Sequence, residues 1–230
     1  MRRSTVTPLP TSLSAQQCFT ADTSRNKGVT REWVDVHADK DGRADRFGLC
    51  AEGEGPTYLA AYLRVVTATG QTFDRPAFQP TPRIMGVTDV NGDGISEVWL
   101  FQGGATAHYA ELVTFKDDAP IFVSDPTASG YDGMDGHDFP WAVTSDLADA
   151  GTECVDLDYD GTLEIVEESQ EWDRSGAGGT LTWSYKVYEF DGTHIHPLSE
   201  HSGKGDPPTT IGLHWQEGLI CQHVKDLLGG

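Results

Sequence analysis

Apolar and polar positions along this chain mainly follow the period of two that a β-strand requires. Thr162-Leu-Glu-Ile-Val-Glu167 alternates in this way, and Val98-Trp-Leu-Phe101 is a short apolar run of residues that favour strands. Because successive strand residues point to opposite faces, such segments predict strands with one or both faces buried. Asp191-Gly192 lies between two further strand-like segments and is a hairpin-turn signal. The pattern predicts an all-β chain of antiparallel hairpins.

Three acidic loops interrupt the predicted strands, and they share one nine-residue frame. Loop 1 is 37–45, loop 2 is 89–97 and loop 3 is 156–164. Each has oxygen-bearing side chains at positions 3, 5 and 9 and glycine at position 6. Position 1 is aspartate in loops 2 and 3 and His37 in loop 1. The loops begin 52 and 67 residues apart, so the frame recurs at the spacing of a structural repeat.

The spacing of the acidic side chains is suited to calcium. Ca²⁺ takes six to eight oxygen ligands at about 2.3–2.6 Å, and acids at alternate positions of a curled loop can face one centre. Glycine at position 6 permits the sharp turn that brings position 9 back towards the others. One such loop alone could be an ordinary Asp/Gly turn, but three copies favour a bound cation that offsets the repulsion between carboxylates.

The frame does not match an EF-hand. An EF-hand needs a bidentate Glu at position 12 and a helix on each side. Position 12 is Gly48 in loop 1, Leu100 in loop 2 and Glu167 in loop 3, so two of the three loops lack the acid. The flanking segments are β-rich, and we therefore expect these loops to join strands.

The segments around each loop predict a repeat: strand, acidic loop, strand, longer connection, strand, tight turn, strand. The repeats cover about 33–80, 83–125 and 150–197, and 211–230 is a partial C-terminal repeat. Residues 1–17 are predicted to form a flexible tail, and 18–230 a single domain. Four antiparallel strands per repeat are the unit of a propeller blade, which must stack on neighbours to bury both faces. We expect propeller-like repeats of four-stranded antiparallel sheets with about three to four blades. The array has three alternative ways to be completed. The two terminal segments could share one blade, the blades could form an open arc, or two chains could form a homodimer.

The loops resemble those of the FG-GAP and VCBS repeats, the integrin-α-type β-propeller repeats with a calcium loop between their first two strands. The resemblance covers about 33–197, lies mainly in the loops, and lacks the family's Phe-Gly…Gly-Ala-Pro signature. It implies side-chain ligands at positions 1, 3, 5 and 9 and a backbone carbonyl at position 7. The implied ligands are Asp89, Asn91, Asp93, Ile95 and Glu97; Asp156, Asp158, Asp160, Thr162 and Glu164; and Asp39, Asp41, Arg43 and Asp45 with His37. The His37 imidazole would offer nitrogen to a hard cation, which is a poor match.

Charge and hydropathy exclude two classes of partner. The chain has 36 Asp+Glu against 16 Lys+Arg, a net charge of −20. A surface this acidic repels phosphate backbones, so we expect no nucleic-acid partner. No window approaches the roughly 18 consecutive apolar residues of a membrane helix, so we expect no membrane insertion.

The four cysteines at 18, 50, 154 and 221 form no Cys-x-x-Cys pair, which argues against a zinc or redox motif. An even count fits two disulfides and an oxidising compartment, although four buried thiols are the alternative. Three pairings are open, and we favour Cys18–Cys50 with Cys154–Cys221 because each pair brackets one acidic loop. We expect a secreted or cell-surface protein, although the basic N-terminus lacks the apolar run of a secretory signal.

The longer connections carry the candidate ligand-binding residues. Trp172 and Tyr109 are suited to stacking on a sugar ring, and Asp173, Arg174 and His108 to hydrogen bonds with hydroxyl groups, although ordinary loop packing is the simpler interpretation. His194 and His196 alternate on a predicted strand and could hold a transition metal, but a solvated hairpin face is favoured. No hydrolase motif identifies a nucleophile.

These patterns together predict an extracellular calcium-binding repeat protein that acts as a non-enzymatic recognition or adhesion module for a carbohydrate or protein ligand. One alternative is a secreted hydrolase with its active site on the blade loops, using a carboxylate pair or His137 and His108. Another is a structural module of a surface assembly. The sequence leaves enzymatic activity undecided but favours its absence.

Overall fold

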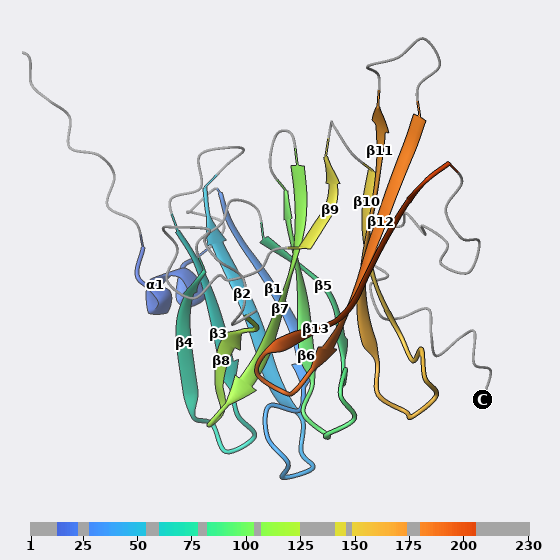
Figure 1. The fold of residues 1–230 in the computed structure, drawn as a ribbon. Coiled ribbons are helices and arrows are strands. Elements are labelled where there is room, and N and C mark those ends of the chain that lie inside the picture. The colour runs from blue at the N-terminus through green and yellow to red at the C-terminus, as the bar shows by residue number, and fades with distance from the viewer. Residues whose placement is uncertain are drawn as a thin grey trace, which may run out of the picture.

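The computed structural model describes residues 13–22, 28–53, 60–77, 82–103, 107–124, 141–145, 149–173 and 180–205 (Figure 1). One short helix, α1 (Ala15–Thr20), precedes a succession of strands. The strands are β1 (Val29–Val36), β2 (Asp45–Glu52), β3 (Ala60–Val66), β4 (Thr72–Ala77), β5 (Pro82–Thr88), β6 (Glu97–Gly103), β7 (Ala107–Lys116), β8 (Ala119–Phe122), β9 (Trp141–Ser145), β10 (Asp149–Val155), β11 (Glu164–Asp173), β12 (Thr180–Phe190) and β13 (Ile195–Lys204).

The strands form three antiparallel four-stranded units. Unit 1 is β1–β4, unit 2 is β5–β8 and unit 3 is β10–β13, and within each unit every strand pairs with the next. In each unit an acidic loop connects the first strand to the second. The prediction of a mostly β chain of four-stranded antiparallel repeats, with acidic loops between strands, is confirmed.

Strand β9 joins unit 2 to unit 3, and the sequence analysis did not foresee this. The first half of β7 pairs with β9 and its second half with β8. Because β9 also pairs with β10, hydrogen bonding runs without a break from β5 to β13. The propeller arrangement and its blade count stay a prediction. The partial repeat predicted at 211–230 lies outside the described residues.

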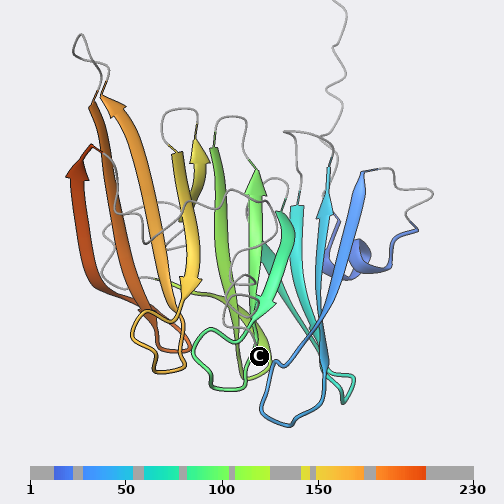
Figure 2. The ribbon, with the colours of Figure 1, turned by 90° about the vertical axis from the view of Figure 1, so that its right-hand side faces the viewer.

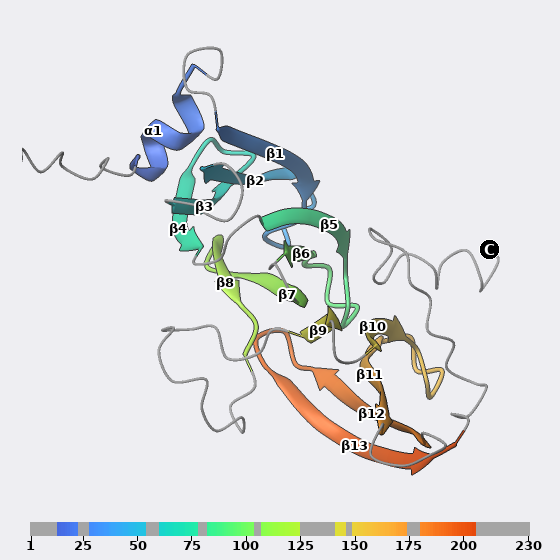
Figure 3. The same cartoon turned by 90° about the horizontal axis from the view of Figure 1, so that it is seen from above.

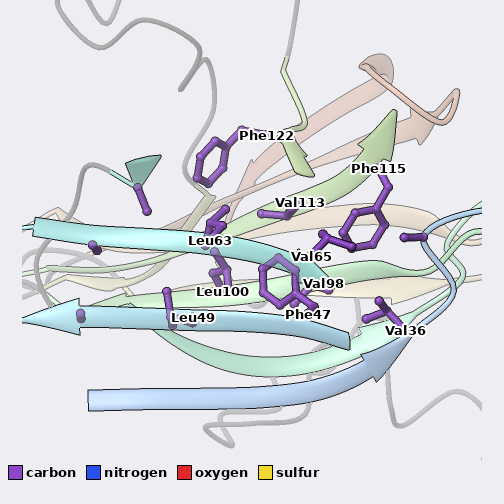
Figure 4. Packing of buried hydrophobic residues seen from close by; sticks show 14 residues of the cluster. Val36, Phe47, Leu49, Leu63, Val65, Val98, Leu100, Val113, Phe115 and Phe122 are labelled. Carbon is purple, nitrogen blue, oxygen red and sulfur yellow. The ribbon is translucent and has the colours of Figure 1, made fainter. Parts of the chain in front are cut away.

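The units stack face to face, and apolar side chains fill the two interfaces (Figure 3). Between units 1 and 2, Phe47 lies edge-on to Phe115 with ring centroids 6.0 Å apart (Figure 4). Val98 and Leu100 of β6 face this interface, whereas Trp99 faces the interface with unit 3. Val98, Trp99 and Leu100 of the apolar run noted in the sequence are therefore buried on both faces of the strand, as expected for a strand of a central repeat.

Helix α1 covers the outer face of unit 1. Cys18 and Phe19 of α1 pack with Cys50 and Trp33 of that unit, and a disulfide joins Cys18 to Cys50. The first predicted disulfide is thus present in the structure. Cys154 is also disulfide-bonded, and its predicted partner, Cys221, lies outside the described residues.

The helix begins inside the range predicted as a flexible tail, 1–17. The Ser14 hydroxyl accepts a hydrogen bond from the Gln17 backbone N–H, and the Gln17 side chain accepts one from the Ser14 N–H. This capping box satisfies two of the donors that a helix N-terminus leaves unpaired. A helix of six residues is marginal by itself, and contacts of Arg31 and Arg64 with its carbonyl groups and side chains hold it on unit 1.

Candidate metal centre

The three acidic loops lie at the same end of the molecule, one beside the next (Figures 1 and 2). Loop 1 contacts loop 2 through Ser96, whose backbone N–H donates to the His37 carbonyl oxygen at 2.8 Å. The Ser96 hydroxyl accepts from the His37 N–H at 3.0 Å. Loop 2 contacts loop 3 through the Leu163 N–H, which donates to the Val90 carbonyl oxygen at 2.8 Å. Stacking of the units therefore aligns loops that are far apart in the sequence.

Loop 2 is folded around its own carboxylates. Asp89, at position 1, accepts hydrogen bonds from the backbone N–H groups of Asp93 and Gly94, at 3.0 and 2.9 Å. Asn91, at position 3, accepts a second bond from the Asp93 N–H at 3.3 Å. Asp93, at position 5, accepts from the Ile95 N–H at 2.8 Å. The alternating side chains thus turn inward over one curl of backbone.

Loop 3 repeats these bonds position by position. Asp156 accepts from the N–H groups of Asp160 and Gly161, both at 3.1 Å, and Asp158 accepts from the Asp160 N–H at 3.2 Å. Asp160 accepts from the Thr162 N–H at 2.8 Å. Two loops with different residues at positions 2, 3, 4, 7 and 8 therefore have the same internal fold.

The backbones of loops 2 and 3 also agree in their left-handed residues. Gly94 and Gly161, at position 6, have φ of 88° and 95°. At position 4, Gly92 has φ of 68° and Tyr159 has φ of 64°. A residue with a Cβ atom is uncommon at such φ, so the shared frame holds Tyr159 in a conformation that glycine adopts freely in loop 2.

The position 9 carboxylate is buried in all three loops and folds back onto position 2. Asp45 accepts from the Ala38 N–H at 3.0 Å, and Glu97 from the Val90 N–H at 2.8 Å. Glu164 accepts from the Leu157 N–H at 2.7 Å. These bonds close each loop and hold one acid close to the start of the loop.

Burial and neighbouring carboxylates raise the pKa of the position 9 glutamates of loops 2 and 3. Burial raises the pKa of Glu97 to about 8, and the negative charges of Asp89 and Asp93 act in the same direction. Burial likewise raises the pKa of Glu164, with smaller contributions from Asp158 and Asp160. Each site therefore concentrates negative charge that a cation would offset.

Loop 1 differs from the other two loops because it contains its own cation. The Arg43 guanidinium donates two hydrogen bonds to Asp41 at position 5, at 2.8 and 2.6 Å. This pairing lowers the pKa of the Asp41 carboxyl. His37 replaces the position 1 carboxylate that organises loops 2 and 3. The predicted ligands of loop 1 thus include an aspartate already engaged by Arg43.

The donor sets of loops 2 and 3 fit a hard cation. Asp156, Asp158 and Glu164 each place a carboxylate oxygen within 4.8 Å of the other two, close enough for one ion to contact all three. An acidic triad of this kind is not specific to calcium. Loop 2 has the same hydrogen bonds, with the Asn91 amide oxygen in place of the second carboxylate.

One supporting residue of loop 2 was missed by sequence reasoning. The Thr114 hydroxyl donates to the second carboxylate oxygen of Glu97 at 3.1 Å. Thr114 lies on β7, 17 residues from Glu97 in the sequence. Only the strand pairing of β6 with β7 brings them together, so no local motif could have indicated the contact.

The candidate ligand-binding residues lie away from the acidic loops. His108 and Tyr109 are near the start of β7, and Trp172 and Asp173 are at the end of β11. Both places are at the strand ends opposite the acidic loops (Figure 1). The side chains of these four residues, together with Arg174 and His137, lie outside the described part of the structure.

No helix among the described residues is long and apolar enough to span a membrane. No family model, curated protein or solved structure matches the chain. The resemblance to FG-GAP and VCBS repeats therefore rests on the loop residues alone and stays a prediction.

Proposed function

We propose that loops 2 and 3 each bind one Ca²⁺ ion and that the protein is a secreted or cell-surface recognition module. The supporting observation is that two loops 67 residues apart in the sequence have the same set of hydrogen bonds around their acidic side chains. The agreement leaves the acidic side chains of both loops turned towards one centre, which supports a common ligand.

The donors of each proposed site follow from the loop positions. In loop 3, Asp156, Asp158, Asp160 and Glu164 would provide carboxylate oxygens and Thr162 its backbone carbonyl. In loop 2 the corresponding donors are Asp89, Asn91, Asp93, Glu97 and the Ile95 carbonyl. Hard oxygen donors in this number match Ca²⁺ better than softer metals.

Calcium would act mainly on stability. Each loop joins the first two strands of its unit, and adjacent loops contact each other. An ion bound to the folded state alone stabilises it by about 2.7 kcal/mol when its concentration is 100 times Kd. Two ions would therefore stiffen one end of the array and leave the opposite end to bind partners.

Recognition of a carbohydrate or protein ligand is the role we assign to that opposite end. Long connections on a rigid β scaffold commonly carry binding residues, and the connections after β6 and β11 emerge there. The Cys18–Cys50 disulfide and the acidic surface suit an extracellular setting. A propeller-like arrangement of the stacked units is part of this proposal.

Calorimetric titration and thermal melting test the calcium sites. Removal of both calcium ions with EDTA should lower Tm by about 10–20 °C, given about 2.7 kcal/mol for each ion and roughly 2–4 °C per kcal/mol for a chain of this size. Asp156→Ala and Asp89→Ala should each abolish one of two binding events. Glu200→Gln, at an exposed position of β13, is the matched control and should keep both. An identical melt with calcium and with EDTA would refute the proposal.

A glycan array probed with and without calcium tests the recognition role. We expect binding to a restricted set of glycans, weakened when calcium is withdrawn. Turnover of a bound glycan would instead establish the hydrolase alternative. Self-association without any glycan signal would favour the structural module.

A further inference from the structure

The outer face of unit 3 carries buried apolar side chains that belong to none of the hydrophobic clusters of the described residues. Val166 on β11 and Val187 on β12 are 0% and 5% exposed, and they are cross-strand partners, so both lie on one face of the sheet. Their neighbours Ile165 and Tyr188 point the opposite way, into the interface with unit 2. Because neither valine belongs to any of the three clusters, their burial indicates a further segment over this face.

Aromatic and polar groups on the same face indicate the same cover. Trp183 and Tyr185 lie on the face of Val187, because they precede it at intervals of two along β12. The indole nitrogen of Trp183 is buried and has no hydrogen-bond partner among the described residues. Glu168, the cross-strand partner of Tyr185, is only 6% exposed. A buried indole N–H is usually paired, and a backbone carbonyl of a segment lying on this face would accept its hydrogen bond.

Disulfide bonding points to the identity of the segment. Cys154 on β10 is disulfide-bonded, and Cys18 and Cys50 are bonded to each other. Since the sequence contains four cysteines, Cys221 is the one left to pair with Cys154. The chain thus leaves β13 after Lys204, at the end of the sheet, and must return to β10, on the other side of unit 3.

The chain beyond β13 is long enough for this path. Lys204 and Cys154 are separated by three strand spacings across the sheet and about six residues along it, or roughly 25 Å in a straight line. The residues between Lys204 and Cys221 span roughly 50 Å when extended. The face towards unit 2 is already filled, so the direct route runs over β12 and β11 on the outer face. Among the described residues, β9 pairs with β10 only at Asp149, which leaves the edge of β10 near Cys154 accessible to the returning chain.

We propose that residues 206–221 form an extended strap that lies on the outer face of unit 3 and is fastened by a Cys154–Cys221 disulfide. Every second residue from 211 to 215 is apolar, which is the period of an extended strand. The strap therefore directs three apolar side chains to the sheet and the residues between them to solvent. Packing of these side chains accounts for the burial of Val166 and Val187. The three are Ile211, Leu213 and Trp215.

The strap matches the cover at the other end of the molecule. There α1 lies on the outer face of unit 1, and a disulfide fastens it to β2. Both terminal units of the array then have a disulfide-fastened cover, which keeps apolar sheet faces from associating with other chains. The strap requires neither bound calcium nor a glycan ligand.

Hydroxyl-radical footprinting of the full chain tests the strap. Leu213→Ser with Trp215→Ser removes apolar contacts, so oxidative labelling of Trp183 and Tyr185 should rise severalfold over the wild type. Trp99, fully buried between units 2 and 3, should stay protected and shows that the variant remains folded.

The matched control changes the opposite side of the strap. His214→Ser with Gln216→Ser alters residues that alternate with the apolar ones, so labelling of the sheet face should equal that of the wild type. Labelling of Trp183 that rises equally in both double variants, or in neither, would overturn the proposal.

Two measurements on the wild-type protein do not depend on how the variants fold. Peptide mapping without reduction should recover Cys154 linked to Cys221 of the same chain. Protection of Trp183 should be the same at low and high protein concentration. A Cys154–Cys154 link between two chains, or protection that is lost on dilution, would show that a second copy covers the face and would contradict the strap.

Discussion

Glu168 on β11 shows what burial does to a single acidic residue. Its side chain is 6% exposed, and none of the hydrogen bonds found among the described residues ends on its carboxyl group. Burial raises its pKa to about 7, and the negative charge of Glu153 adds to the effect. The position 9 acids of the loops are buried too, but each accepts a backbone hydrogen bond. Among the described residues, Glu168 has no such backbone hydrogen bond.

The raised pKa of Glu168 predicts that stability falls as the pH rises. Below its unfolded-state pKa of 4.5 the group is protonated in both states, and the contribution is fully present. Between pH 4.5 and 7 the unfolded chain loses this proton while the folded chain keeps it, so the free energy of unfolding decreases by up to about 1.4 kcal/mol per pH unit. Above pH 7 both states are ionised and the loss is complete.

Urea unfolding between pH 5 and 8, in EDTA, measures this contribution. The raised pKa of Glu97 also makes the free energy of unfolding fall as the pH rises. The contribution of Glu168 is therefore obtained by comparing the wild type with Glu168→Gln. The variant should lose part of the pH dependence and gain stability relative to wild type above pH 7. Parallel pH profiles for the two proteins would contradict the prediction. Glu200→Gln, at an exposed position, should match the wild type.

At the scale of elements, one nine-residue frame produces two kinds of loop. Loops 2 and 3 place an aspartate at position 1, and its carboxylate gathers the N–H groups of positions 5 and 6. Loop 1 has His37 there and pairs its position 5 aspartate with Arg43. The glycine at position 6 is left-handed in all three. The turn geometry is therefore shared, whereas the charge at the centre is not.

This difference predicts that the wild-type protein binds two calcium ions rather than three. Replacing His37 with Asp and Arg43 with Thr restores the residues of the other loops and frees Asp41 from its guanidinium partner. The double variant should bind a third ion, counted by isothermal titration. Arg43→Lys, which keeps a positive charge, should still bind two. A third ion in the wild type, or none gained by the double variant, would show that Arg43 does not block loop 1.

At the scale of the whole molecule, each unit depends on a neighbour to cover its faces. Unit 2 is covered by unit 1 on one side and by unit 3 on the other. The outer face of unit 1 is covered by α1, which the Cys18–Cys50 disulfide ties to β2. The helix therefore caps one end of the array, as terminal elements of repeat proteins do.

Because the disulfide ties α1 to unit 1, we predict that removing it destabilises mainly that end of the molecule. Cys18→Ser with Cys50→Ser opens a loop of 32 residues, which should lower the free energy of unfolding by about 3–4 kcal/mol. Hydrogen exchange should accelerate most in α1 and β2. Calcium binding should be unchanged because loops 2 and 3 belong to other units. Uniformly faster exchange across all three units would show that the disulfide does more than hold the cap.

Much of the fold followed from local patterns. Alternation around Glu164 and the apolar run at Val98 predicted strands because side-chain direction along a strand is a property of the backbone. The acidic loops were predicted between strands for the same reason. Strand extents were less accurate: β13 continues to Lys204, beyond the repeat boundary predicted at 197, because its pairing with β12 extends the hairpin.

Features that depend on distant partners were not predicted. The insertion of β9 between β7 and β10 needs an edge that only the assembled sheet offers. Helix α1 is short and weakly helical by pattern, and its position is set by contacts with unit 1.

The sequence by itself determined the β class, the repeated unit and the places where acidic side chains cluster, because these depend on residues a few positions apart. Tertiary structure alone decided how the units stack, which loops lie side by side, and which cluster already contains a cation. The reason is physical: hydrogen bonding along a strand and turn chemistry are local, whereas burial, and with it the pKa of Glu97 or Glu168, depends on neighbours that only folding brings together.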